Sequence, residues 1–489
     1  MKSKEIRMPK LWEALLSFGF LIAIAAVAIL RYETSVHVPM IFGAAFAAAM
    51  AVRLGYSWKQ IETSMFDGVR SALPAVVILV LVGALIGIWI LAGVVPSMIY
   101  YGLHIINPAF FLVTALLVCS ITSLATGTSW GTAGTVGVAF MGIAAGMDIP
   151  LGVAAGAVVS GAYFGDKLSP LSDTTVMSSS IAGVDTIAHI KHMSKNTIVA
   201  YIITVVGFLF LGMRYSGSAD SETIMALQSG ILEHFNVSPI LLLPPVIVIV
   251  TIALKAPALV GIFAGLVAGI VMAMSMQGVD IGRIFSVGYS GFRLESDIFE
   301  LTRLFNRGGM TSVGYAIFMI IPAMCFGGIM ELTKQLEVIV DGILLKLAKG
   351  TTSLMATSAA TTFLINVATA EQYMAVILPN KMFAKSFRDR DLHPKMLSSS
   401  TDTTGTLTSA LVPWNTCGAF MMSVLGVSAF AYAPYALFNI LAPLTLIGMA
   451  AIGKMKVKIS DDVNSLSDTE RAHYDAKLES LSLQGAAGE

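Results

Sequence analysis

Long apolar runs recur along this sequence, and they constrain its fold more than any other feature. The first run covers 11–30 and contains a single charged residue, Glu13. A helix of about twenty residues is long enough to cross a hydrocarbon layer of about 30 Å. Of the 489 residues, 56% are hydrophobic and 12% are charged, whereas roughly 25% are charged in an ordinary soluble domain. Because several comparable runs follow, the sequence predicts an all-α polytopic membrane protein that resides in a lipid bilayer.

The apolar runs form two similar halves. In the first half, spanning helices are expected at 11–30, 36–54, 71–93, 150–182 and 194–213, with an amphipathic piece at 57–69 and a re-entrant helical hairpin at 108–146. The second half repeats this plan at 238–254, 257–275, 311–331, 393–424 and 433–452, with a hairpin at 351–387. Each half then has five crossings, one of them broken, plus a hairpin. Five is odd, so we predict two inverted-topology repeats, a plan common among secondary transporters.

This plan divides the chain into five parts. They are a cytoplasmic N-terminus (1–10), a first transmembrane repeat (11–213), an external linker (214–237), a second transmembrane repeat (238–452) and a cytoplasmic tail (453–489). The lysines support the orientation, because every lysine except Lys167 falls at a terminus or in a loop that the plan places inside. Positive residues concentrate on the cytoplasmic side of membrane proteins. Both termini are therefore predicted to be cytoplasmic.

Polar, glycine-rich sequence interrupts the first half at 123–175. The expected hairpin tip carries Thr126, Thr128 and Ser129, and the expected helix break at 165–175 carries Asp166, Lys167, Asp173 and Thr174. Irregular backbone at membrane depth is tolerated only where it lines a cavity or is buried in protein, and embedded charges are costly and usually functional. Two plainer interpretations remain open. Small residues also allow close helix packing, and Asp166 with Lys167 could form a structural ion pair.

The second half carries a counterpart of this stretch. Glu371 is the only acid between Asp341 and Asp389, and Asp402 is the only acid between Asp391 and Asp461. Amide and hydroxyl side chains accompany them at Asn366, Thr408 and Asn415. Isolated acids in apolar sequence favour a functional role. For Asp402 and Asn415, capping of a helix end is the alternative.

These residue types suit a small hard cation. Carboxylate, hydroxyl and carbonyl oxygens are the ligands such ions prefer, and we expect Asp173, Thr128, Ser129 and Glu371 to bind transported Na⁺. A buried carboxylate can hold a proton or Na⁺ but not comfortably both, so the sequence predicts exchange of Na⁺ for H⁺ by competition. All seven histidines lie in loops, in the tail or near helix ends, which assigns proton transfer to carboxylates.

Other function classes find little support. The net charge is zero without a compact basic patch, which argues against a nucleic-acid partner. Phosphate-binding loops, zinc-ligand spacings and nucleophile elbows are absent from the sequence. We therefore expect no cofactor and no enzymatic activity. Whether the chain forms a homodimer is left open.

Three segments resemble one known family. TGTSWGTAGTVGVAFMGIAAGM (126–147), GDKLSPLSDTT (165–175) and LTSALVPWNTCGAFM (407–421) are similar to motifs of the NhaC-type sodium/proton antiporter family, in the broader ion transporter superfamily. The resemblance implies a multi-pass secondary transporter of the bacterial inner membrane. The family also includes exchangers that couple Na⁺ and protons to malate or lactate, so exchange of a small carboxylate is the alternative. Lys167 is the only candidate cation for such an anion, because no arginine lies deep in a predicted span. This favours the inorganic ion.

Overall fold

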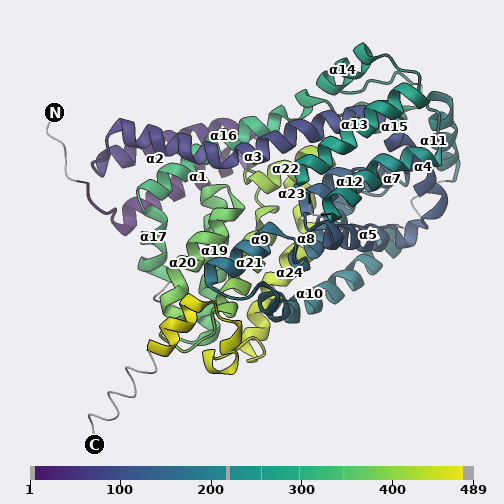
Figure 1. Cartoon of the computed structure of the whole chain (residues 1–489). Helices are drawn as coiled ribbons and strands as arrows, with labels where there is room; N and C mark the ends of the chain where they lie inside the picture. Colours follow the sequence, from purple (N-terminus) through teal and green to yellow (C-terminus); the bar gives the residue numbers. More distant parts are fainter. Residues whose placement is uncertain are drawn as a thin grey trace, which may run out of the picture.

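Helices make up almost all of the ordered structure. The computed structural model describes residues 6–215, 221–254, 256–296, 298–344, 346 and 348–476, and within these ranges it has no β-strand beyond two isolated bridges. Figure 1 shows an elongated molecule with α1 and the C-terminal segment near one end, here called the proximal end. Helices α4, α11, α14 and α15 lie near the opposite, distal end. This arrangement is all-α, as predicted.

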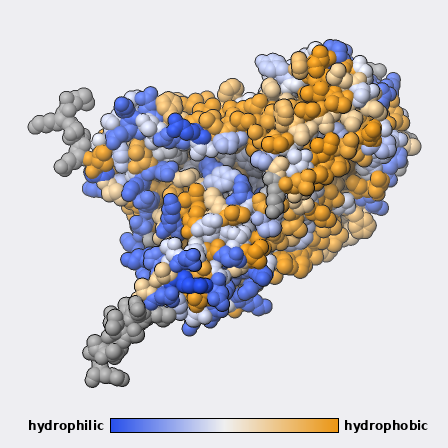
Figure 2. Space-filling view, in the orientation of Figure 1, coloured by the Kyte–Doolittle hydropathy of each residue, from blue (hydrophilic) through white to orange (hydrophobic). Residues whose placement is uncertain are grey.

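Six helical segments in the described ranges are long and apolar enough to cross a membrane. They are Leu11–Tyr32 (α1), Trp58–Leu91 (α3), Pro108–Thr126 (η1 and α5), Thr186–Tyr215 (α10), Ala258–Met276 (α13) and Met310–Leu332 (η4 and α16). Two bent pairs bring the number to eight: Met225–His234 with Pro239–Ala253, and Thr416–Leu425 with Ala429–Tyr435. Large apolar side chains such as Ile202, Phe210 and Phe263 are exposed, and Figure 2 shows an apolar surface over this part of the molecule. The protein is a multi-pass membrane protein.

The remaining helices complete the two halves. The first half also contains α2 (His37–Arg53), α4 (Val94–Ile105), α6 (Ser129–Thr132), α7 (Val138–Gly146), α8 (Leu151–Leu168) and α9 (Asp173–Ala182). The second contains α12 (Leu243–Ala253), α17 (Gln335–Ile339), α19 (Thr351–Thr369), α20 (Gln372–Arg388), α21 (Pro394–Ser409), α22 (Thr416–Leu425), α23 (Ala429–Tyr432) and α24 (Leu437–Ala451). Between or beside these lie α11 (Ser221–His234), α14 (Ile281–Ser290) and α15 (Phe299–Phe305).

Several helix boundaries differ from those predicted. The pieces expected at 57–69 and 71–93 form one continuous helix, α3, which begins with Ser57 and Gln60 in a capping box. Helix α10 likewise begins at Thr186, eight residues before the predicted start at 194. In both cases the polar residues before the apolar run belong to the same helix, so hydrophobicity alone places the start of the helix too late. Helices α4, α14 and α15 were not predicted, and α11 lies within the expected linker at 214–237.

The predicted interruptions are confirmed. Helix α8 ends at Leu168 and α9 begins at Asp173, while α21 ends at Ser409 and α22 begins at Thr416. The hairpin tips fall at Gly127 and Ala370, which both adopt the left-handed conformation, with φ of 70° and 58°. Each is followed by a helix N-cap, Thr128 or Glu371. The same local geometry therefore recurs 243 residues apart. The inverted relation between the halves stays a prediction.

Close packing holds these interrupted helices against their neighbours. A Cβ atom on Gly165 of α8 would lie 2.3 Å from the carbonyl oxygen of Ser120 in α5, and one on Gly328 of α16 would lie 2.1 Å from that of Ser64 in α3. Small residues at helix contacts let two backbones approach closely where water provides no hydrophobic driving force. The Ser- and Thr-rich helix α21 is buried at every position and forms the polar centre of the molecule.

The C-terminal segment packs against both broken-helix units at the proximal end. The backbone N–H of Ser467 donates to the carbonyl of Gly183, which follows α9 (2.8 Å), and the N–H of His393, which precedes α21, donates to Val457 (2.9 Å). Lys395 Nζ also contacts Asp462 Oδ2 at 2.5 Å. The described part of the tail thus connects the proximal ends of α9 and α21.

Candidate functional site

A cavity of about 140 Å³ lies where the two hairpin tips and the two helix breaks meet. Its polar lining comes from α6 (Thr128, Ser129), from the first break (Asp166, Asp173) and from the second half (Glu371, Gln372, Tyr373, Thr416). Side chains of α3 and α13, such as Pro74 and Ile262, form its apolar wall. Residues that are 200 positions or more apart in the sequence are thereby brought to one site.

Asp166 is the most enclosed acid on the first-half side. It lies in the last turn of α8 and is 4% exposed. Its Oδ2 accepts a hydrogen bond from the backbone N–H of Ser129 at 3.1 Å, across to the hairpin tip. Its Oδ1 is buried and has no hydrogen-bond partner among the described residues. A buried carboxylate oxygen without a partner is costly, so this atom marks a place where a cation or a proton would be stabilised.

Asp173 and Tyr373 join the two halves across the cavity. Asp173 is the first residue of α9, and its Oδ1 accepts a hydrogen bond from the Thr174 N–H at 2.8 Å. The hydroxyl of Tyr373, from the start of α20, donates to Asp173 Oδ2. Asp173 is exposed to solvent, in contrast to the enclosed Asp166. Sequence analysis missed Tyr373, although its position two residues after Glu371 on the same tip was an available signal.

Glu371 supplies the third carboxylate. It is the N-cap residue of α20, and its Oε2 accepts the N–H of Met374 at 2.9 Å. Only 5% of the residue is exposed. The N-terminus of α22 is held beside this tip, because the Thr416 N–H donates to the Ala370 carbonyl at 2.9 Å. Three carboxylates from both halves therefore face one small cavity, and no lysine or arginine of the described residues lines it.

The structure brings together five of the eleven predicted site residues. Thr128, Ser129, Asp166, Asp173 and Glu371 line the cavity, and they include all four that were expected to bind Na⁺. The other six lie outside its lining: Thr126, Thr174, Asn366, Asp402, Thr408 and Asn415. Thr126 donates within α5 to Thr122 (2.9 Å), and the Thr174 hydroxyl contacts that of Ser172 (3.1 Å).

Asn366 and Asn415 form hydrogen bonds across the second-half helix break, outside the lining of the cavity. The Asn366 side-chain nitrogen donates to the Gly405 carbonyl (2.7 Å) and to the Thr408 hydroxyl (2.9 Å). The Asn415 nitrogen donates to Asn366 Oδ1 at 3.1 Å, while Asn415 Oδ1 caps α22 through the Cys417 N–H at 3.0 Å. Asn415 is therefore a helix cap, which was the alternative interpretation.

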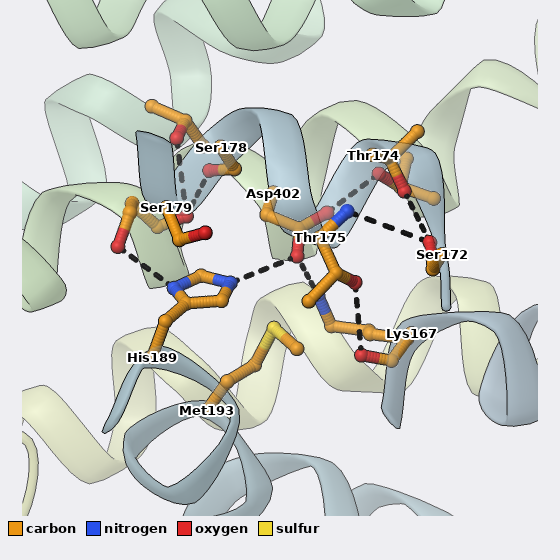
Figure 3. A network of polar contacts seen from close by, with 12 residues as sticks. Lys167, Ser172, Thr174, Thr175, Ser178, Ser179, His189, Met193 and Asp402 are labelled. Carbon is orange, nitrogen blue, oxygen red and sulfur yellow. Dashed lines mark hydrogen bonds and ion pairs between the residues drawn. The ribbon is translucent and has the colours of Figure 1, made fainter. Parts of the chain in front are cut away.

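Asp402 belongs to a separate buried network, drawn in Figure 3. Its Oδ2 lies 3.6 Å from Lys167 Nζ and 3.2 Å from His189 Nε2, and its Oδ1 accepts the Thr406 hydroxyl at 2.7 Å. Lys167, His189 and Asp402 are all fully buried. Lys167 thus pairs with an acid of the other half instead of with its neighbour Asp166. His189 was not expected here, because its sequence position indicated only a helix end.

The central cavity leads toward the proximal end. Ser71 lines it and also lines a second cavity of about 310 Å³ between α3, α16 and the second hairpin, where Asp67 and Glu331 lie. Figure 2 shows the surface hollowed between these elements. On the other side, Trp130 of α6 stacks on Phe420 of α22, with ring centroids 4.3 Å apart. Trp130 also lines the central cavity, so this stack closes part of its wall.

In the part of the chain that the structure describes, no three His, Cys, Asp or Glu side chains are grouped as a metal site. A cation in the cavity would consequently draw part of its ligand shell from hydroxyl and carbonyl oxygens, such as those of Thr128, Ser129 and Thr416.

Discontinuous helices that place polar groups at the middle of a helical membrane protein define the class of secondary transporters. The chain belongs to the Na⁺/H⁺ antiporter family, whose model matches residues 6–192 and 161–454. It is 39% identical to the malate-2H⁺/Na⁺-lactate antiporter of Bacillus subtilis, over 92% of this chain and 95% of that protein. It is 35% identical to the Na⁺/H⁺ antiporter NhaC of Alkalihalophilus pseudofirmus, over 90% and 95%. It is 33% identical to the arginine/ornithine antiporter ArcD of Halobacterium salinarum, over 92% and 94%.

Proposed function

We propose that this chain exchanges Na⁺ for H⁺ across the bacterial inner membrane, with both termini in the cytoplasm and the proximal end facing inward. The observation that carries the proposal is the convergence of Asp166, Asp173 and Glu371 on one small cavity without a basic residue. Membership of the Na⁺/H⁺ antiporter family and the likeness to an NhaC antiporter support the same reaction.

Charge balance provides the mechanism. Asp166 and Glu371 are buried, so their ionised forms are costly without a counter-ion. Either a proton or Na⁺ can supply the compensating charge, and binding of one disfavours the other. The unpartnered Oδ1 of Asp166 is the atom where this competition is most direct. The hydroxyls of Thr128 and Ser129 can replace part of the hydration shell of Na⁺.

Alternating access requires that the cavity open toward the distal end as well. The Trp130–Phe420 stack joins the first hairpin to the second broken helix. Because Trp130 belongs to the first hairpin and Phe420 to the second broken helix, we propose that these units move as a core against the remaining helices. Asp173 and Tyr373, which lie on different halves, stay in contact within this core.

Exchange of a small carboxylate together with Na⁺ and H⁺ is the second candidate function. The observation that favours it is the 39% identity to a malate-2H⁺/Na⁺-lactate antiporter over 92% of the chain. The cavity with three acids is unsuited to an anion, so this function needs a basic site elsewhere in the molecule.

The reaction can be tested with purified full-length protein in liposomes that contain a pH-sensitive dye. An inward Na⁺ gradient alone should alkalinise the lumen, and ²²Na⁺ uptake should follow an imposed proton gradient. Asp166→Asn, Asp173→Asn and Glu371→Gln should each reduce ²²Na⁺ uptake at least tenfold. Asp148→Asn is the matched control, because Asp148 is exposed and outside the cavity. A dye response that requires malate or lactate would exclude the first function in favour of the second. Full uptake by all three variants would refute the site.

A further inference from the structure

Arg307 lies in a third cavity, toward the distal end. This cavity of about 320 Å³ lies between the loop at 307–315 and the end of α22 at 424–428. Arg307 Nε is buried and has no hydrogen-bond partner. The guanidinium makes one long hydrogen bond, from Nη2 to the Val138 carbonyl at 3.4 Å. Among the described residues it forms no ion pair, although a partly buried cation within a membrane protein usually has one.

The lining of this cavity complements a negative charge. No aspartate or glutamate occurs among the described residues that line it, whereas the hydroxyls of Ser312, Ser423 and Ser428 do. The Ser312 hydroxyl already donates to the Gly309 carbonyl at 2.7 Å. The Ser428 hydroxyl only accepts a hydrogen bond, from the Phe430 N–H at 3.3 Å, so its own proton is free to be donated. The cavity therefore presents a cation and unused donors.

We propose that this cavity binds a small carboxylate, such as a hydroxy acid, on the distal side of the membrane. Guanidinium presents a planar fork of N–H groups that matches a carboxylate in two parallel hydrogen bonds. The volume lies at the lower end of the roughly 300–1,000 Å³ typical of small-molecule sites. The hydroxyls of Ser423 and Ser428 can donate to a second polar group of the same molecule. The proposal extends the second candidate function, because it assigns a place to the anion that the central cavity cannot hold.

The position of the cavity agrees with a role in transport. Thr416 and Cys417 at the beginning of α22 line the central cavity, while Met422 and Ser423 near its end line the distal one. The two sites are thus separated by about 8–11 Å along one short helix, at 1.5 Å per residue. The Trp130–Phe420 stack lies between them. A carboxylate at Arg307 would therefore occupy the distal entrance of the same pathway.

The competing explanation is structural. Arg307 lies near the C-terminal end of α22, where a positive charge is favoured by the helix dipole. That role requires neither a cavity nor free hydroxyls, and it predicts no ligand. Binding measurements distinguish the two explanations.

The experiment measures binding of ¹⁴C-malate and ¹⁴C-lactate to the purified full-length protein by equilibrium dialysis. We expect saturable binding of at least one compound to the unmodified protein. Arg307→Gln should weaken it roughly ten- to hundredfold, the range for loss of a charged hydrogen-bond partner, and Arg307→Lys should weaken it less. Arg283→Gln is the matched control, since Arg283 is an exposed arginine on α14 outside the cavity, and its binding should equal that of the unmodified protein.

Two results would overturn the inference: no saturable binding by the unmodified protein, or equal affinity in Arg307→Gln. If Arg307→Gln does not elute as a single species, Ser423→Leu replaces it, because this substitution fills the cavity and retains Arg307. Unchanged binding by Ser423→Leu would overturn the inference equally. Dye measurements of Na⁺/H⁺ exchange by the unmodified protein are independent of these results, so failure of this site and failure of the proposed exchange are distinguishable.

Discussion

Gly127 is the position where a single methyl group should most affect the proposed ion site. Its φ of 70° is left-handed, and a Cβ atom there would lie 2.7 Å from Leu171 Cβ and 2.8 Å from the Leu171 carbonyl carbon. Real Cβ contacts essentially never fall below 3.0 Å. Since the second atom belongs to the backbone, a rotamer change cannot relieve the overlap. The chain between Asp166 and Asp173 would have to move.

The cost of Gly127→Ala can be worked out from these two effects. The left-handed conformation costs alanine roughly 1–2 kcal/mol, and overpacking a tight contact costs typically 1–3 kcal/mol. We therefore expect the free energy of unfolding to fall by about 2–5 kcal/mol. Transport should fall further than stability suggests, because Leu171 lies two residues before Asp173. In vesicles that contain equal amounts of folded protein, we expect ²²Na⁺ uptake at least tenfold below that of the unmodified protein.

Ala370→Gly at the equivalent tip is the matched comparison. Removing the left-handed strain of alanine returns about 1–2 kcal/mol. Ala370 is 1% exposed, so loss of its methyl group costs about 0.8 kcal/mol, and the added freedom of glycine in the unfolded chain costs a further 0.4–1 kcal/mol. These contributions nearly cancel, and both stability and uptake should remain close to those of the unmodified protein. Normal uptake by Gly127→Ala, or equal losses in both variants, would refute this account of the tip.

Three further predictions concern the surroundings of the site. Tyr373→Phe removes the hydroxyl that donates to Asp173. Because both residues are open to solvent, losing this hydrogen bond should cost about 1 kcal/mol of Na⁺ binding, and the Na⁺ concentration for half-maximal uptake should rise about fivefold. Tyr289→Phe, which changes an exposed tyrosine, should have no effect. Lys167→Met leaves Asp402 without its lysine and should lower the free energy of unfolding by about 3–5 kcal/mol in denaturant titrations. The double variant with Asp402→Asn should recover part of this lost stability. Equal stability of the single and double variants would contradict the pairing. Acidification should release the C-terminal segment. Burial lowers the pKa of His393, and the hydrogen bond and charge of Lys395 lower the pKa of Asp462 although burial opposes this. Both groups bind protons more readily when the segment is undocked. Docking therefore weakens as the pH falls below about 6.5, where free histidine titrates, and again near 3.9, where free aspartate titrates. Hydrogen exchange of residues 455–466 that is equally slow at pH 8 and pH 5 would contradict this prediction.

The interruptions of the membrane helices could be predicted because they depend on local chemistry. Gly127, Pro170 and the hydroxyl-rich segments disfavour a continuous helix, and acids such as Asp173 and Glu371 are rare in apolar sequence. The helix extensions of α3 and α10 could not be located in the same way, because polar residues outside the membrane are compatible with helix and with loop. Hydropathy therefore located the middle of each span better than its ends.

Contacts between side chains of the two halves could not be predicted from the sequence. Asp402 looked equivalent to Glu371, since each is an isolated acid, yet only Glu371 faces the cavity. The difference arises from the first half, which presents Lys167 and His189 to Asp402 and Asp173 to Tyr373. The spacing of residues along the chain does not predict contacts between residues that are 200 or more positions apart.

The position of Lys167 links the buried ion pair to the ion site. Asp166 and Lys167 are adjacent in the last turn of α8, so a displacement of the break changes both contacts together. Asp166 faces the cavity, whereas Lys167 contacts Asp402 of α21. Separating a buried ion pair is strongly unfavourable unless each partner finds a new one. The two broken helices are therefore expected to move as one unit. The site can then change its exposure only by moving against α3 and α13, which line the other side of the cavity.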